Sequence, residues 1–115
     1  KKAELRCWAA LVGRISMLLS LDAYKQQQFD QIAAKIMVEP EKYIDFNSVS
    51  DFYNAAWLKD FPQGTQASAT GLDDGAEEFY AVVQFKQQYL KFDIKENHST
   101  LSFQNMNGET FKCNF

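Results

Sequence analysis

Residues 79–115 alternate between apolar and polar side chains, and this period of two constrains the fold more than any other feature of the chain. Successive side chains of a strand point to opposite faces of a sheet, so the pattern predicts an antiparallel meander with one buried and one solvated face. The positions predicted to face the core are Phe79, Ala81, Val83, Phe85, Leu90, Phe92, Ile94, Leu101, Phe103, Phe111, Cys113 and Phe115.

Keeping the apolar residues on one face predicts one of the first two turns of this meander and leaves the other open. Opposing Ile94 with Leu101 leaves residues 96–99 as a four-residue turn. Gln87-Gln88 separates the first two runs and has poor chemistry for a tight turn. Two interpretations stay open there, a turn or one long bent strand.

The last hairpin has a more specific turn signal. A two-residue Asn107-Gly108 turn would place Phe103 opposite Lys112 and split the apolar face. A three-residue turn at 106–108, with Gly108 in the left-handed region, keeps Phe103 and Phe111 on one side. We therefore predict the three-residue turn.

The N-terminal part of the chain has the spacing of amphipathic helices. Apolar residues recur every three or four positions over 3–20 and again over 22–38, where Asp22 suits the N-cap. Pro40 either ends the second helix or starts a short helical turn through Tyr43. The apolar stripe of the second helix comprises Phe29, Ile32, Ala33, Ile36 and Met37.

A third helical segment and a long loop complete the helical half. Ser48 and Asp51 have the spacing of a capping box and predict a helix to about residue 60, which Pro62 stops. Residues 62–78 are rich in Gly, Ser, Thr and acidic side chains, a composition typical of a loop.

Together these segments predict one α+β domain over 1–115, with N-terminal helices packed on one face of a three- or four-stranded antiparallel meander. Its parts are a helical region 1–60, an acidic loop 61–78 and the meander 79–115. A chain of 115 residues is long enough for one such core. In element order this outline is similar to cystatin-like and nuclear-transport-factor-2-like domains, which implies helices lying on a curved sheet, but no motif of either family carries a residue role to this chain.

The net charge of −3 is unevenly distributed along the sequence. Residues 1–60 are balanced, residues 61–78 contribute only carboxylates, and residues 79–115 are slightly basic. No segment has the basic density that neutralises many phosphates, so nucleic-acid binding is not expected. No stretch reaches the roughly 20 apolar residues needed to span a membrane, which predicts a soluble domain.

Cysteine usage leaves the cellular compartment open. Cys7 and Cys113 lie near opposite ends of the chain, and two buried thiols would suit a cytoplasmic protein. A disulfide between them would instead indicate a secreted or periplasmic protein. The chain begins with Lys1 rather than Met, which we take to indicate a trimmed or processed piece.

The sequence contains no pattern typical of an active site, a metal site or a cofactor site. His98 is the single histidine and lies in a predicted turn, without a neighbouring nucleophile or ligand set. The acidic cluster lacks the spacing of a calcium loop, and the glycines form no phosphate-binding motif. We therefore expect a non-enzymatic protein without a cofactor.

Two surfaces are candidates for binding another protein. On the polar face of the meander, the partner-binding candidates are Tyr80, Tyr89, Lys91, Lys95 and Lys112, and the alternation puts Lys86 on the same face. Tyrosine offers contact area and a hydrogen-bonding tip, which suits protein recognition. The acidic candidates, which would meet a basic partner, are Asp73, Asp74, Glu77 and Glu78.

The resulting hypothesis is a protein-interaction module, either a subunit domain or a small inhibitor or immunity-type protein. The alternative is a small-ligand binder or cofactor-free enzyme with a pocket between helices and sheet. That pocket would be lined by Trp8, Tyr24, Phe29 and Met37, with Asp22 or Asp30 as its polar group. A homodimer through the first helix is a third possibility, because its apolar arc exceeds what one sheet covers.

Overall fold

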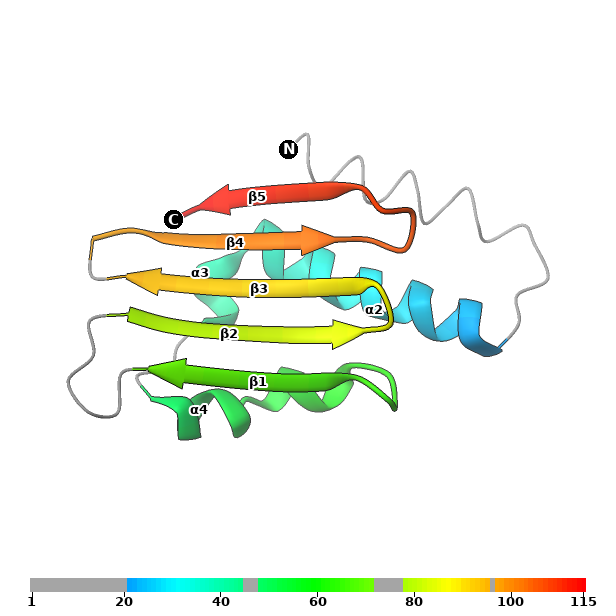
Figure 1. Ribbon diagram of the computed structural model, residues 1–115, viewed down its shortest axis with the longest axis horizontal. Coiled ribbons are helices and arrows are strands. Elements are labelled where there is room, and N and C mark those ends of the chain that lie inside the picture. Colours follow the sequence, from blue (N-terminus) through cyan, green and yellow to red (C-terminus); the bar gives the residue numbers. More distant parts are fainter. Residues whose placement is uncertain (1–20, 45–47, 72–77, 96) are drawn as a thin grey trace.

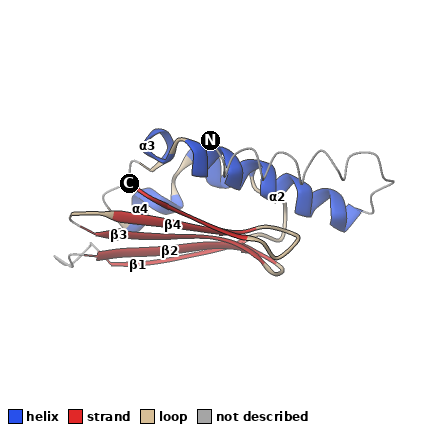
Figure 2. Ribbon diagram, turned by 90° about the horizontal axis from the view of Figure 1, so that it is seen from above, coloured by secondary structure: helices blue, strands red, loops and turns tan. Residues whose placement is uncertain are grey.

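The computed structural model describes residues 21–44, 48–71, 78–95 and 97–115, and these form two layers (Figures 1 and 2). Helices cover one face of an antiparallel sheet, and in Figure 2 they all lie on the same side of it. The predicted α+β architecture is confirmed. The first predicted helix, 3–20, lies outside the described residues.

The sheet has five strands rather than the three or four predicted, and they follow one another in chain order. The additional strand, β1, arises from residues that we expected to form a loop. Its inward side chains are the half-buried Ala67 and Ala69, whose alternation with polar residues is a weaker signal than the large apolar side chains of the later strands. The strands are β1 (Gln66–Gly71), β2 (Glu78–Phe85), β3 (Gln88–Lys95), β4 (Ser99–Gln104) and β5 (Thr110–Asn114).

The register of the last hairpin is as predicted. Phe103 pairs with Phe111, and their rings stack with centroids 5.8 Å apart. Gly108 has a φ of 80°, in the left-handed region where a glycine is favoured. A backbone hydrogen bond from Asn105 to Glu109 closes the turn over 106–108.

The two other turns of the meander differ from prediction. Ile94 pairs with Ser99 instead of Leu101, so the β3–β4 turn is shorter than expected. A shift of two residues leaves every side chain on the same face, which is why the alternation did not reveal it. Between β2 and β3 the chain turns tightly at Lys86 (φ 56°) and Gln87, so the long bent strand is ruled out.

The helical layer follows the predicted segments with one change. The Ser48 hydroxyl accepts a hydrogen bond from the Asp51 amide (3.1 Å), as predicted for a cap. The helix that it opens ends at Tyr53, however, and a separate 3-10 helix continues to Asp60. The elements are α2 (Leu21–Val38), α3 (Pro40–Tyr43), α4 (Val49–Tyr53) and the 3-10 helix η1 (Ala56–Asp60).

An aromatic core joins the two layers. Phe52 of α4 is fully buried, and its ring lies 5.9 Å from the rings of both Phe79 and Phe92 on the sheet. The Trp57 ring stacks on Phe92 (5.7 Å), and its indole N–H donates to the Tyr43 carbonyl (2.9 Å). The buried rings on the inward face of the sheet thus pack against α4 and η1.

Candidate functional site

The face of the sheet opposite the helices is its open face, since no described helix covers it (Figure 2). Strand pairing arranges its side chains in rows that run across the sheet. Three rows cross all five strands: Thr70–Tyr80–Asp93–Thr100–Asn114, Ser68–Val82–Lys91–Ser102–Lys112 and Gln66–Gln84–Tyr89–Gln104–Thr110. Glu78, the first residue of β2, pairs with Lys95, the last residue of β3.

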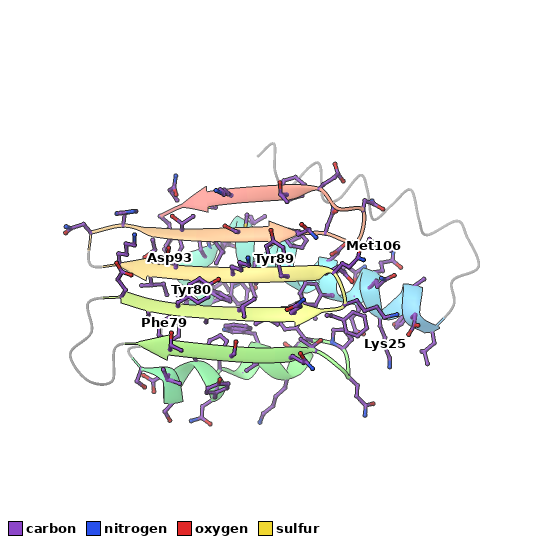
Figure 3. All side chains as sticks on the ribbon, viewed as in Figure 1. Lys25, Phe79, Tyr80, Tyr89, Asp93 and Met106 are labelled. Atoms are coloured by element: carbon purple, nitrogen blue, oxygen red, sulfur yellow. The ribbon has the colours of Figure 1, made fainter. Side chains whose placement is uncertain are left out.

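Two tyrosines lie on the central strands of this face (Figure 3). Tyr80 of β2 is 45% exposed. Tyr89 of β3 is half-buried, and the Lys91 ammonium lies 4.4 Å from its ring centroid. A cation over an aromatic ring at this distance is attractive, so Lys91 and Tyr89 form one unit on the surface.

The lysines of the open face differ in their partners. Lys95 lies 4.0 Å from the Glu78 carboxylate, at the limit of an ion pair between exposed groups. Lys91 and Lys112 occupy the same row with Ser102 between them. Neither lysine has a carboxylate at ion-pair distance among the described residues.

Of the predicted binding residues, the structure places Tyr80, Tyr89, Lys91, Lys95 and Lys112 on this one face. Lys86 is not on it: the lysine lies in the β2–β3 turn and forms a 2.9 Å ion pair with Asp22 of α2. Hydrogen bonding to the Lys86 ammonium lowers the pKa of Asp22 below its usual value.

The acidic candidates divide into two groups. Asp73, Asp74 and Glu77 lie outside the described residues. Glu78 begins β2 and is exposed. Sequence reasoning missed the contribution of β1, which adds Gln66, Ser68 and Thr70 to the open face; the alternation of these residues with Ala67 and Ala69 was the available signal.

A second polar cluster is buried between α2 and the two hairpin turns at one end of the sheet. Asp30 is 3% exposed and accepts two hydrogen bonds, from the Gln88 side chain (2.8 Å) and from the Met106 amide (3.0 Å). The Gln88 amide group also donates to the Gln26 carbonyl (2.7 Å). Desolvation raises the pKa of Asp30 to about 6, and the nearby charge of Glu109 acts in the same direction.

The residues of the predicted pocket lie in different environments. Phe29 and Met37 are core residues, whereas Tyr24 is 59% exposed. Asp22 is on the surface in its ion pair with Lys86, and Trp8 lies outside the described residues.

The described residues contain neither a metal-binding cluster nor a membrane-spanning helix. Within them, no three His, Cys, Asp or Glu side chains group closely enough to hold a metal ion. His98 is exposed near the β3–β4 turn. None of the helices in the described part of the chain has the length and apolar character required to cross a membrane. Cys113 is half-buried, and Cys7 lies outside the described residues, so two free thiols and a disulfide both stay predictions.

Comparison of the chain with protein-family models, with curated proteins and with solved structures finds no match.

Proposed function

We propose that this chain is a non-enzymatic protein-interaction module that binds a partner protein through the open face of its sheet. The observation that supports the proposal is the grouping of Tyr80, Tyr89 and Lys91 on the adjacent inner strands β2 and β3, on the face that no described helix covers. Tyrosines on a solvent-facing surface, surrounded by hydroxyl, amide and ammonium groups, have the composition of a recognition surface.

The acidic residues form the second part of the proposed contact. Glu78 lies at the margin of the open face, next to Lys95. With Asp73, Asp74 and Glu77 preceding it in the sequence, it would present carboxylates to a basic region of the same partner.

The test compares two matched double variants in affinity capture from the source cell. Tyr80→Ala with Lys91→Ala alters the open face, whereas Tyr24→Ala with Lys35→Ala removes the same side chains from exposed positions on α2. We expect the amount of partner recovered to fall at least tenfold with the first variant, relative to the unmodified chain. With the second variant the recovery should be unchanged. Equal recovery with both variants would rule out the open face as the binding surface.

Charge reversal tests the acidic part separately. We expect Asp73→Lys with Asp74→Lys to weaken capture of the same partner, and to weaken it less at high salt because exposed charges are screened. Unchanged capture would confine the contact to the sheet face.

The alternative, a ligand-binding or catalytic pocket, has one observation in its favour. Asp30 is a buried carboxylate with a raised pKa, a property that is frequent at functional sites. Each of its oxygens already accepts a hydrogen bond, one from Gln88 and one from Met106. We therefore assign Asp30 to the packing of α2 against the hairpin turns.

A further inference from the structure

The two edges of the sheet are β1 and β5, and their outward backbone groups are in different states. In β1 the Ala69 amide donates to the Tyr53 hydroxyl of α4 (3.1 Å), and α4 packs along this strand. An incoming strand would have to displace that hydroxyl. The β1 edge is therefore protected by the protein itself.

The β5 edge has no such cover among the described residues. Ser99 and Phe115 exchange both backbone hydrogen bonds at 2.9 Å, and Asn105 donates to Glu109 at the other end of the pairing. Because bonded pairs alternate in an antiparallel ladder, Phe111 and Cys113 also bond inward to β4. The alternate residues of β5 have backbone N–H and C=O groups that point away from the sheet. These residues are Thr110, Lys112 and Asn114.

We propose that β5 is a docking edge for an extended acidic segment of a partner protein, which adds to the sheet as a sixth strand. The inference rests on the proposed protein-binding function and specifies its mode. Three outward donors and three outward acceptors in alternate positions match the backbone of one extended peptide of about five residues.

The positive charge of the β5 edge favours an acidic peptide as the added strand. Lys112 lies at the centre of the edge, and its row continues through Ser102 to Lys91, so two ammonium groups face the same side without a described carboxylate partner. A neighbouring strand runs about 5 Å away, which brings the residue opposite Lys112 within reach of its charge. An Asp or Glu there would be attracted to the Lys112 ammonium.

The same lysine disfavours a second copy of this chain. Two copies of the chain could pair through their β5 strands about a twofold axis. If all three outward residues of each strand form hydrogen bonds, Lys112 of one copy lies directly opposite Lys112 of the other. Like charges in opposed positions destabilise strand pairing. The edge therefore discriminates against self-association while accepting an acidic strand.

The test selects binders to the full chain from a displayed library of random twelve-residue peptides. We expect enriched peptides to carry acidic residues at alternating positions. Lys112→Glu keeps the backbone donor and reverses the charge, so it should weaken these peptides at least tenfold, and a peptide with Lys in place of its acidic residues should bind this variant. Lys59→Glu makes the same change on the exposed part of η1 and should leave binding unaltered.

A second variant isolates the backbone contact. Lys112→Pro removes an outward N–H that takes no part in the β4–β5 ladder, so proline is compatible with this edge position. We expect at least a tenfold loss of peptide binding. Hydrogen exchange of the unmodified protein gives an independent readout: peptide binding should protect the amides of Thr110, Lys112 and Asn114, whereas those of Phe111 and Cys113 are protected beforehand.

Three results would overturn the edge proposal: enriched peptides without acidic alternation, no gain of protection at the three outward amides, or full binding by both Lys112 variants. If capture of the partner protein is lost with the Tyr80 and Lys91 variant but persists with Lys112→Pro, the open face remains the binding surface and the edge does not. If neither variant affects capture, both proposals fail.

Discussion

At the scale of single residues, Asp30 combines two opposing requirements. Its two oxygens each accept a hydrogen bond, from Gln88 and from Met106, an arrangement that suits the ionised carboxylate. Its burial favours the neutral acid, and the balance raises its pKa from 3.8 to about 6. The hydrogen bonds of Asp30 therefore connect α2 to the two hairpins. Their contribution to the free energy of unfolding depends on pH.

We predict that this contribution appears in the pH dependence of unfolding. Between pH 3.8 and about 6 the folded chain holds a proton on Asp30 that the unfolded chain has released. The contribution of Asp30 to the free energy of unfolding is thus largest below pH 3.8 and falls as the pH rises to about 6, by on the order of 2–3 kcal/mol.

Urea unfolding of the unmodified chain and of Asp30→Asn, between pH 4 and 7, measures this contribution. Asn does not titrate, so the free-energy difference between the two proteins should shift with pH in favour of the variant. A constant offset from the altered hydrogen bonds does not affect the slope. A difference that stays flat across this range would show that Asp30 titrates as an exposed carboxyl does.

At the scale of elements, the β4–β5 turn depends on one buried amide side chain. The Asn105 side-chain oxygen accepts from the amides of Asn107 (3.0 Å) and Glu109 (2.9 Å), and its nitrogen donates to the Glu109 carboxylate (3.0 Å). We expect Asn105→Ala to lower the free energy of unfolding by about 1–2 kcal/mol, because two turn amides lose their acceptor. Exposed Asn97→Ala is the control, with a change below about 0.5 kcal/mol. Equal midpoints in urea would show that the turn holds without Asn105.

The elements also show how far the sequence determines the fold. Alternation identifies the face of each residue, and keeping Phe103 and Phe111 on one face selects the register of the last hairpin, in which Gly108 adopts a positive φ. Alternation does not distinguish registers that differ by two residues, hence the error at Ile94. Strand β1 was missed because an edge strand with alanines on its inner face buries too little to need an apolar pattern.

The buried cluster around Asp30 could not be predicted from the sequence, because its members are far apart along the chain. Asp30 is 58 residues from Gln88 and 76 residues from Met106, and no local pattern connects them. The open face was accessible to sequence reasoning because its members are placed by the same alternation that defines the core. Its rows across five strands required the observed pairing.

At the scale of the whole molecule, the two faces of the sheet differ in how tightly their side chains are packed. Its inner face packs against helices through buried rings, with Phe52 in contact with both Phe79 and Phe92. Its open face carries Tyr80, which is 45% exposed. Substitutions on the two faces should therefore affect different properties of the protein.

We predict that Phe52→Ala lowers the free energy of unfolding by about 3–5 kcal/mol, because the cavity removes ring contacts from both layers. Tyr80→Ala should change the free energy of unfolding by less than about 1 kcal/mol and still weaken partner capture. Urea unfolding measured alongside capture separates the two effects. A large loss of stability with Tyr80→Ala would mean that this tyrosine supports the fold, and the weakened capture would then follow from unfolding rather than from a lost contact. Retained stability with lost capture would identify the open face as a surface that the fold itself does not need, which is the property expected of a binding site.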